Sequence, residues 1–405
     1  MEEKLSKYKS NALEAVSFTL VISEREVDNP GVCEERCMFQ PLLAHQVFGE
    51  RELIFGYEDP HINLFYHHNS LKCLLDIKYK SKISGFEVDD IPKLMNEWLP
   101  RNYFTSKEEY KRMIKNDVKD QMFGTVIHQF KQSNEVFFLD EGEVATCTYK
   151  ITRVNTQDEL FQEYHERFET FIIWFIDAAN FINLKDDRWI IFYMYEEVEL
   201  PGKNEKIISP IGFTAIYKFF SYPDSNRARI SQFFILPTHQ NKGLGTIFYQ
   251  TVYSQIMKMP DVTDLTVEEP NELFQKMRDY CDAILIHTDL KKNGRNIASM
   301  NNKILYSYFA KHKINRKQSL RLSDILQYVT AIQSGPKQRR HIQDLLYERF
   351  KHQKMNEKRV GKMARGSLTN KEEVNEDELH QEIESYISQI EPVADKIVKV
   401  LLKAE

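Results

Sequence analysis

Residues 240–245 read Gln240-Asn241-Lys242-Gly243-Leu244-Gly245 and lie between an apolar run and an amphipathic segment. The apolar run, Ala228–Leu236, is typical of a strand, and the apolar spacing from Leu244 onward predicts a helix. Glycines at the start of a helix let the backbone approach a ligand, because they lack a Cβ atom. The N–H groups of the first helical turn attract anions, and Lys242 adds charge. The segment therefore predicts either a diphosphate site or a tight strand-to-helix turn without a ligand.

The glycine spacing at 240–245 excludes two familiar phosphate motifs. The dinucleotide fingerprint needs a third glycine at the correct offset, and a Walker loop needs a Gly-Lys-Ser/Thr ending. Neither is present. The loop must therefore be interpreted from the segments around it.

The surrounding pattern predicts a sheet with one crossover helix. Three strand-like runs precede the loop, at Trp189–Tyr195, Ile211–Phe220 and Ala228–Leu236. The short turns at 201–204 and 222–226 favour antiparallel neighbours. The helix after the loop leads to a strand at Val262–Val267, and a strand–helix–strand unit brings two strands parallel. An apolar face over Asp158–Ile182 predicts a buried helix, so we expect an α/β (α+β) domain over residues 126–285.

Residues 1–125 predict a smaller mixed β/α domain. Its strands are expected at Val16–Ile22, Glu52–Tyr57, Ile62–His67 and Leu71–Tyr79. A helix over Ile91–Met113 is expected to link it to the next domain.

Beyond residue 285 the pattern is helical. Helices are expected at Ile297–His312, Leu322–Gln333, His341–Lys351 and Leu379–Leu402, giving a helical domain over 286–351 and a charged tail with a terminal helix over 352–405. Lys337–Arg365 holds ten Lys/Arg against three Asp/Glu, whereas Glu372–Glu384 holds seven acids and no Lys/Arg. Such blocks indicate solvated helices, a partly disordered tail, or a docking surface for a partner.

The composition narrows the class of protein. Its 55 Lys and Arg against 60 Asp and Glu give a net charge of −5, which argues against a dedicated nucleic-acid binder. The length and 42% hydrophobic content predict two or three domains with real cores. The longest apolar run, 171–176, is far short of the ~20 residues of a membrane span. Because Met1–Ser10 lacks the apolar stretch of a secretory signal, we expect an intracellular protein.

The five cysteines, an odd number in a long chain, argue against a disulfide framework. Cys33 and Cys37 could hold a metal, but no second Cys/His pair with zinc-like spacing lies near them. We therefore expect reduced thiols and no metal.

Several motifs together resemble one enzyme family. Gln-x-x-Gly-x-Gly after an antiparallel meander resembles motif A of the GNAT superfamily of N-acetyltransferases. The resemblance extends to the type B histone acetyltransferases, through Val-Glu-Glu-Pro-Asn at 267–271, Lys-Met-Arg-Asp at 276–279, Ser231-Gln232, Trp-Phe-Ile-Asp at 174–177, Asp-Asp-Arg-Trp at 186–189, Phe48-Gly49 and Phe-Gly-Tyr at 55–57. It covers nearly the whole chain and implies a GNAT-type core with a mixed β-rich N-terminal domain and a helical C-terminal domain.

The resemblance implies acetyl-CoA as the co-substrate. The positions that match the family's cofactor site are Phe233, Phe234, Ile235, Gln240, Asn241, Lys242, Gly243, Leu244, Gly245, Thr246 and Asn271. An exposed strand backbone can pair with the amides of the pantetheine arm, although Phe233–Ile235 could equally be a core strand. Asn271 could instead be a helix N-cap.

The resemblance also implies the catalytic acids. Glu268 matches the family's general base, and Glu269 matches a second acid. Strand alternation would point these two side chains to opposite faces unless the strand ends between them. Asp177 stands where several family members have Glu, so we favour a supporting or tail-binding role for it over base catalysis.

The implied acceptor is the basic N-terminal tail of newly made histone four, accompanied by its histone-three partner. Family tail-contact positions match Glu50, Arg51, Glu52, Trp189, Tyr217, Lys218 and Phe219. A WD-repeat β-propeller histone-binding subunit and both cytoplasmic and nuclear residence are also implied. Three alternatives remain open: another protein or small-amine acceptor, a non-catalytic histone escort that holds acetyl-CoA, and nucleic-acid binding through Lys337–Arg365.

Overall fold

The computed structural model describes residues 5–29, 37–116, 120–135, 144–199, 206–364 and 375–404. Cys33 and the predicted turn at 201–204 lie outside these residues. The chain divides into two compact units. Unit 1 comprises Met1–Lys218 and Ile230–Leu244, and unit 2 comprises Phe219–Arg229 and Gly245–Glu405. The four domain ranges expected from the sequence stay predictions.

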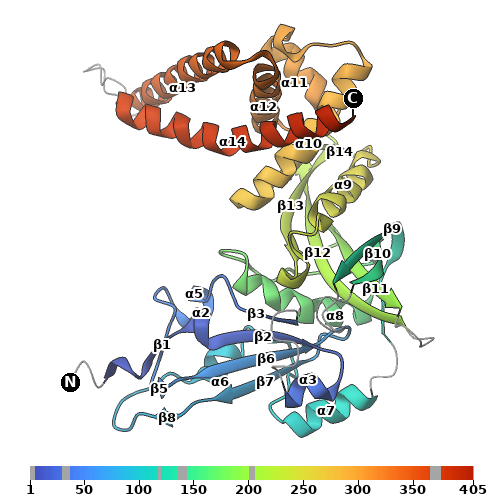
Figure 1. Cartoon of the computed structure of the whole chain (residues 1–405), viewed down its shortest axis with the longest axis vertical. Coiled ribbons are helices and arrows are strands. Elements are labelled where there is room, and N and C mark those ends of the chain that lie inside the picture. Colours follow the sequence, from blue (N-terminus) through green and yellow to red (C-terminus); the bar gives the residue numbers. More distant parts are fainter. Residues whose placement is uncertain are drawn as a thin grey trace. The chain divides into compact units, whose positions relative to one another are not determined.

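Unit 1 begins with short strands and helices. The strands are β1 (Lys9–Asn11), β2 (Val16–Val21), β3 (Met38–Phe39), β4 (Leu53–Phe55), β5 (Tyr57–Glu58), β6 (His61–His67), β7 (Cys73–Lys78) and β8 (Ser81–Lys82), and the helices are α2 (Ala12–Ala15), α3 (Glu24–Asp28), α5 (His45–Phe48), α6 (Ile91–Met95) and α7 (Lys107–Asn116). The main sheet has the order β3-β2-β6-β7, with β2 parallel to β6 and β6 antiparallel to β7 (Figure 1). All four predicted strand regions are confirmed, although Gly56 divides the second into β4 and β5.

The predicted continuous helix over Ile91–Met113 is wrong. Helix α6 ends at Met95 and α7 starts at Lys107. Between them Phe104 pairs with β7: its N–H donates to the Cys73 carbonyl at 2.7 Å, and its carbonyl accepts from the Leu75 N–H at 2.9 Å. Pro100, which lacks an N–H, cannot donate a helical hydrogen bond in this stretch.

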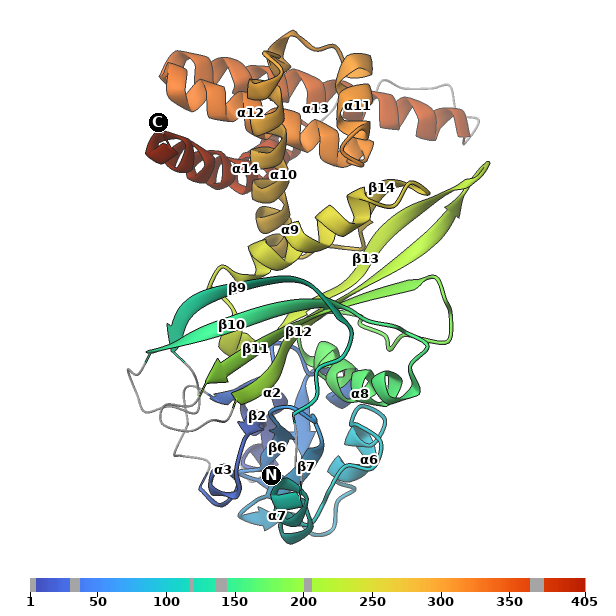
Figure 2. The ribbon, with the colours of Figure 1, turned by 90° about the vertical axis from the view of Figure 1, so that its right-hand side faces the viewer.

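A second sheet has the order β14-β13-β12-β11-β10-β9. Its strands are β9 (Thr125–Glu135), β10 (Val144–Arg153), β11 (Trp189–Glu199), β12 (Lys206–Ser221), β13 (Ser225–Ile235) and β14 (Val262–Val267). Strands β9 to β12 pair antiparallel in chain order, and Figure 2 shows these strands side by side. The β11–β12 pair confirms one of the two predicted antiparallel pairs, and β13 lies next to β12 as expected.

Strands β9 and β10 were not expected from the sequence. Strand β9 has no buried residue among those whose exposure is described, so no apolar alternation marks it. In β10, by contrast, Cys147, Tyr149 and Ile151 are fully buried at every second position. That spacing is the signal that could have identified the strand.

The predicted buried helix over Asp158–Ile182 is shorter than expected. Helix α8 (Glu159–Glu169) passes into the 3₁₀ helix η2 (Thr170–Trp174) and ends there. The Trp174 carbonyl accepts the N–H groups of Leu42 and Leu43, both at 3.0 Å, so the N-terminal segment takes the place of another helical turn. Asp177 therefore lies in a turn and not on a helix.

Aromatic side chains from distant segments form the core of unit 1. Phe18 of β2 lies 5.6 Å from the rings of both Phe171 and Trp174, and Phe234 of β13 lies 5.5 Å from Phe175. These contacts join the N-terminal sheet to α8–η2 and to the end of β13. The aromatic core therefore fixes the strand that leads into the glycine loop.

Unit 2 is helical apart from β14 and parts of β12 and β13. Its helices are α9 (Leu244–Met257, which begins on the last residue of unit 1), α10 (Glu272–Lys292), α11 (Asn302–Ala310), α12 (Arg316–Ser334), α13 (Pro336–Ala364) and α14 (Glu376–Ala404), and the 3₁₀ helix η4 spans Ile297–Ser299. Helix α12 contacts α13 and α14. The predicted boundary at residue 285 falls inside α10. Three of the four predicted C-terminal helices are confirmed and are longer than expected, whereas the first, Ile297–His312, is divided into η4 and the shorter α11.

The two charged blocks near the C-terminus pair with each other where they are described. Lys351 and Lys354 of α13 lie 3.2 and 2.7 Å from Glu376 and Glu382 of α14. Exposed pairs of this kind each contribute little stability. In this part of the chain the blocks are solvated helices.

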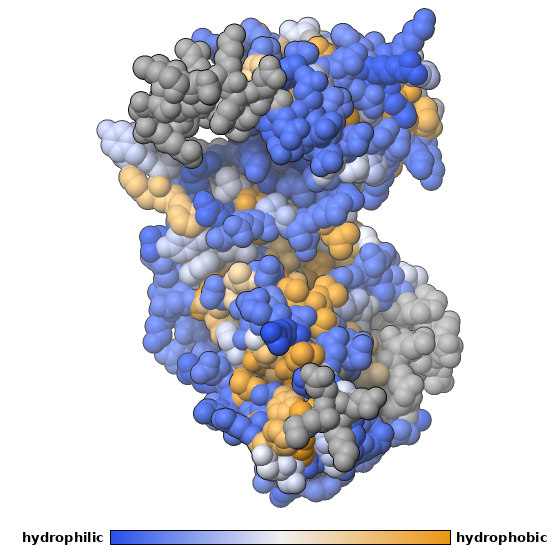
Figure 3. All heavy atoms as spheres, turned by 90° about the vertical axis from the view of Figure 1, so that its left-hand side faces the viewer, coloured by the Kyte–Doolittle hydropathy of each residue, from blue (hydrophilic) through white to orange (hydrophobic). Residues whose placement is uncertain are grey.

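One face of the molecule is drawn by hydropathy in Figure 3, where hydrophilic residues dominate and hydrophobic side chains also reach the surface. No described helix has the length and apolar content needed to cross a bilayer.

Candidate functional site

The glycine loop of unit 1 follows β13 and the 3₁₀ helix η3 (Pro237–His239). Asn241 and Gly243 have φ angles of +60° and +79°, so the chain passes twice through the left-handed region. A Cβ atom added to Gly243 would meet nothing within 4 Å. The loop thus presents open space on this side, which a ligand can occupy.

The loop leads directly into α9. Leu244 is buried and anchors the start of the helix, while Gly245 and Thr246 lie half-buried in its first turn. N–H groups of a first turn have no partner within their helix. Residues 237–246 contain no acid, and Lys242 supplies a positive charge. These residues fit a diphosphate group such as that of acetyl-CoA.

The end of β13 serves both core and loop. Phe234 and Ile235 are buried, whereas Phe233 is half-buried. The Gln240 side-chain amide donates to the Ile235 carbonyl at 2.8 Å and so closes the loop onto the strand. The core-strand interpretation is therefore correct for the Phe234 side chain. Pairing of the strand backbone with the pantetheine arm stays a prediction.

A β-bulge lies beside this strand end. The β11–β12 register shifts after Met194, which faces Gly212, because Ile211 is an extra residue in β12. A Cβ atom on Gly212 would lie 2.6 Å from the Phe234 carbonyl oxygen. Only glycine allows β12 to approach so closely, and bulges are common next to functional sites.

In unit 2, the predicted acids follow β14. Glu268 and Glu269 lie in a bend directly after Val267, and both are exposed. The strand ends before both acids, so strand alternation does not separate their side chains. An oxygen of Glu268 lies 4.0 Å from Arg229, a loose ion pair in which both side chains are about half exposed.

Asn271, also in unit 2, is the N-cap of α10. Its side-chain oxygen accepts the Phe274 N–H at 2.8 Å. This contact confirms the helix-capping interpretation. Contact with a cofactor stays a prediction.

Asp177 of unit 1 meets a residue that the sequence did not indicate. One of its oxygens lies 3.1 Å from His45 Nε2, and the carboxylate is 79% exposed. His45 Nδ1 lies 3.7 Å from Glu52, whose Oε1 also accepts the N–H groups of Ala44 and His45. The fold thus brings the predicted residues Asp177 and Glu52 together on either side of His45. Glu50 and Arg51, which precede Glu52 in the chain, are exposed.

Three of the predicted tail-contact residues, Trp189, Tyr217 and Lys218, lie on β11 and β12 of unit 1. Trp189 pairs with Tyr217, and their ring centroids are 4.8 Å apart. The Tyr217 hydroxyl donates to Asp186 at 2.9 Å, and the Arg188 guanidinium lies 4.8 Å from the Tyr217 ring. The two rings form a partly exposed aromatic surface with Asp186 and Arg188 beside it. Lys218 is the next residue of β12 after Tyr217.

Phe219 belongs to unit 2. It is 39% exposed, and the Arg229 guanidinium lies 4.6 Å from its ring centroid. Arg229 therefore links Phe219 to Glu268 within that unit. Unit 1 holds most of the predicted loop and tail-contact residues, whereas unit 2 holds Phe219, Gly245, Thr246, Glu268, Glu269 and Asn271.

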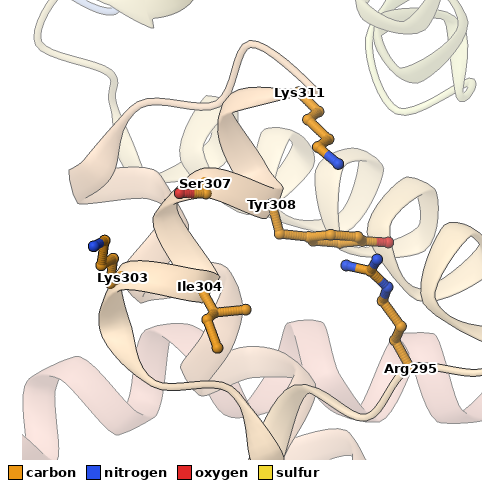
Figure 4. A pocket seen from close by; sticks show the side chains of 6 residues that line it. All are labelled: Arg295, Lys303, Ile304, Ser307, Tyr308 and Lys311. Carbon is orange, nitrogen blue, oxygen red and sulfur yellow. The ribbon is translucent and has the colours of Figure 1, made fainter.

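Two hollows in unit 2 contain none of the predicted residues. The smaller, of about 410 Å³, is lined by Arg295, Lys303, Ile304, Ser307, Tyr308 and Lys311 (Figure 4). Tyr308 points toward Arg295, whose guanidinium lies 5.3 Å from its ring centroid. Three of these lining residues are cations and none is a carboxylate. The hollow would therefore repel a basic peptide tail, and it offers no carboxylate that could act as a general base. The larger hollow, of about 730 Å³, lies between α9 and α10.

Among the described residues no group of three or more His, Cys, Asp or Glu could hold a metal ion. The described cysteines, Cys37, Cys73, Cys147 and Cys281, are buried free thiols.

Two family models match the chain. The model described as "Histone acetyl transferase HAT1 N-terminus" matches residues 8–177, and the one described as "Acetyltransferase (GNAT) family" matches residues 149–277. The mixed α/β architecture is thus a GNAT acetyltransferase fold. A solved aminoglycoside acetyltransferase from a soil metagenomic sample aligns over 30% of this chain and 78% of its own, at 15% identity and a TM-score of 0.22, too low for any argument.

Similar proteins cover most of the chain. The histone acetyltransferase type B catalytic subunit of Homo sapiens is 30% identical, over 84% of this chain and 79% of the relative. That of Kluyveromyces lactis is 30% identical over 82% and 84%, and that of Cryptococcus neoformans 25% over 93% and 98%. The chain therefore belongs to the family of type B histone acetyltransferase catalytic subunits.

Proposed function

We propose that this chain transfers the acetyl group of acetyl-CoA to lysine ε-amines in the N-terminal tail of newly made histone four, with Glu268 as general base. Its family makes it a GNAT acyltransferase that acts on histones. The observation that carries the finer proposal is the exposed Glu268 carboxylate at the end of β14, which forms a loose ion pair with Arg229.

The chemistry requires a base because a lysine amine is charged at neutral pH. Its pKa of about 10.4 makes deprotonation at pH 7 cost roughly 4.6 kcal/mol. An exposed carboxylate can accept that proton directly or through water, and so lower the barrier. Bound acetyl-CoA would supply the acetyl thioester. The residues of this chain that would hold it are the loop Gln240–Leu244, the first turn of α9 and the end of β13.

The surface properties of unit 1 support a basic peptide as acceptor. The Trp189–Tyr217 pair offers aromatic faces for lysine stems and arginine planes, while the charge of Asp186 is already paired with Arg188 at 2.7 Å. The carboxylates of Asp177 and Glu52 could pair with further basic residues of a tail. We assign these residues to tail binding, and we keep histone three and a WD-repeat β-propeller subunit as proposed partners, with residence in both cytoplasm and nucleus.

The decisive test replaces Glu268 with Gln. We expect at least ~10²-fold lower turnover on a histone-four tail peptide, because the base is lost, while acetyl-CoA binding persists. Glu272→Gln is the matched control, since Glu272 is four residues away and pairs with Lys276 at 2.6 Å. Near-normal turnover by folded Glu268→Gln protein would overturn the assignment of the base.

Substrate comparison tests the acceptor. Mass mapping of acetylated lysines on histones, beside turnover on polyamines, should show a clear preference for the histone-four tail. Faster acetylation of polyamines would favour the small-amine alternative. A wild-type protein that binds acetyl-CoA and histones without any turnover would favour the escort alternative.

A further inference from the structure

A chain of buried and half-buried polar side chains lies in unit 1 and ends on the glycine loop. It begins at Glu196 of β11, which is 1% exposed. One Glu196 oxygen accepts the Tyr149 hydroxyl at 2.6 Å, and the other lies 3.3 Å from His239 Nε2. His239, itself 3% exposed, is the last residue before the loop. Glu196 therefore holds the start of the loop through His239.

The same carboxylate reaches the middle of the loop by a second route. The Tyr149 hydroxyl accepts from the Asn134 amide at 2.7 Å, and the Asn134 oxygen accepts from the Gln132 amide at 3.1 Å. Gln132 Nε2 also donates to the Lys242 carbonyl at 3.1 Å. Strands β9, β10 and β11 thus each supply one or more members of a network that contacts the loop at two points.

The charge of Glu196 argues for a positional role. Burial alone would raise its pKa, but His239, the Tyr149 hydroxyl and Lys242 together lower the pKa below its usual value. An ionised Glu196 carries the same sign of charge as a phosphate, so it cannot attract the ligand that the loop fits. Its network holds the His239 ring directly before the loop and, through Gln132, the Lys242 carbonyl within the loop. A connected hydrogen-bond network of this kind is rigid.

We infer that Glu196 is a positioning residue, which through His239 and through Tyr149, Asn134 and Gln132 holds the Gln240–Leu244 loop in the shape that receives the diphosphate of acetyl-CoA. This inference rests on the proposed function, because it takes the loop as the diphosphate site. Loss of the network should weaken binding of the phosphate-bearing part of the co-substrate. The acetyl-transfer step itself should change little.

The test measures CoA affinity by titration calorimetry in the full-length protein. Glu196→Gln should raise the Kd for CoA about tenfold, and KM for acetyl-CoA should rise with it while kcat stays within about twofold. Turnover with S-acetyl-pantetheine, which lacks the diphosphate, should be the same in variant and wild type. A purely structural role would impair both donors alike.

Glu197→Gln is the matched control. Glu197 is the neighbouring residue on the opposite face of β11 and pairs with Lys150 and Lys206. Its replacement should leave CoA affinity unchanged. If Glu196→Gln does not fold, Gln132→Ala on the more exposed strand β9 removes only the last link, and it should weaken CoA binding about threefold.

The outcomes separate the two claims. Unchanged CoA affinity in both Glu196→Gln and Gln132→Ala, or equal losses with S-acetyl-pantetheine, would overturn the inference and leave the proposed function intact. A wild-type protein that does not bind CoA would instead overturn the proposed function.

Discussion

At the scale of single residues, Gly243 gives the loop its shape. Its φ of +79° lies in the left-handed region, and the space beside its Cα is open. An L-residue with a side chain pays about 1–2 kcal/mol in this conformation. Position 243 combines two features, a backbone conformation that would strain any residue bearing a side chain and an open side that can face a ligand. The two effects can be separated by mutation.

We expect Gly243→Ala to weaken CoA binding at least tenfold, because the new methyl group would occupy the space proposed for the diphosphate. Gly294→Ala is the control: Gly294 has a φ of +60° and equally open surroundings, but it lies after α10, away from the loop in sequence. Both variants should lose similar stability in thermal unfolding, and only the first should lose affinity. Equal CoA affinity in the two would contradict the proposed loop site.

The loop at 240–245 could be predicted from its glycines, because a positive φ and a close approach to a ligand both favour glycine. His45 could not. It lies 132 positions before Asp177, and only the packing of the N-terminal segment against the end of η2 brings its ring within 3.1 Å of that carboxylate. The same holds for Glu196 and His239, since a buried carboxylate in an apolar strand carries no pattern that names its partner.

At the scale of elements, the close contact between β12 and β13 is the most sensitive feature near the site. Gly212 lies next to the bulge at Ile211, and its missing side chain leaves room for the Phe234 carbonyl. A methyl group there meets backbone, which cannot rotate away. The two strands would have to separate.

Gly212→Ala should therefore destabilise the protein by about 1–3 kcal/mol, the range for overpacking in a core. Thermal unfolding would measure the loss, and CoA titration would show a parallel loss, because β13 leads into the loop. Gly85 lies in an exposed bend with a φ of +81° and no atom within 4 Å of an added Cβ atom, so Gly85→Ala tests whether backbone strain without a steric overlap has these effects. A stable Gly212→Ala protein with normal affinity would show that the strands adjust.

Elements with strong periodicity were predictable, and those shaped by neighbours were not. The strands around the loop and three of the four predicted C-terminal helices follow their apolar spacing. The helix predicted to Ile182 ends at Trp174, because Leu42 and Leu43 bond its last carbonyl. Strand β9 lies at the edge of its sheet with polar residues on both faces, so its partner β10 determines it.

At the scale of the whole molecule, the net charge of −5 said little about partners. Much of the charge cancels locally, as in the pairs between α13 and α14. What matters for a basic substrate is where individual carboxylates are exposed. Among the predicted site acids, the exposed ones are Glu50 and Asp177 in unit 1 and Glu268 and Glu269 in unit 2.

The pH dependence of stability has one predictable contribution from unit 1. Burial raises the pKa of Glu169 from 4.5 to about 7, although the Ile182 N–H and the Gln232 amide lower it in part. Between these values the folded chain holds a proton that the unfolded chain has released. The stability contribution is therefore complete below about pH 4.5 and is lost as the pH rises through about 7, by up to about 3 kcal/mol.

Glu169→Gln should remove this loss. The free energy of unfolding, measured at pH 5 and pH 7.5, should fall less between the two values in the variant than in the wild type. His165, whose pKa burial lowers to about 3, acts in the opposite direction, and its Nε2 lies 4.0 Å from Glu169. The pair of measurements is therefore repeated with His165→Asn in both proteins, which leaves Glu169 as the group that differs. An identical fall in both proteins would show that Glu169 is ionised in the fold.

The hydrogen bond from Gln132 to the loop ends on the main-chain carbonyl of Lys242 and not on its side chain. A carbonyl is present whatever amino acid occupies position 242. Substitutions there can change the charge that faces the co-substrate while the anchoring of the loop persists. The Lys242 charge also helps to lower the pKa of Glu196, so a substitution at position 242 keeps the bond from Gln132 and changes the electrostatics around the loop. Related enzymes that keep Gln132 should therefore keep this anchor even where another residue stands at the position matching Lys242.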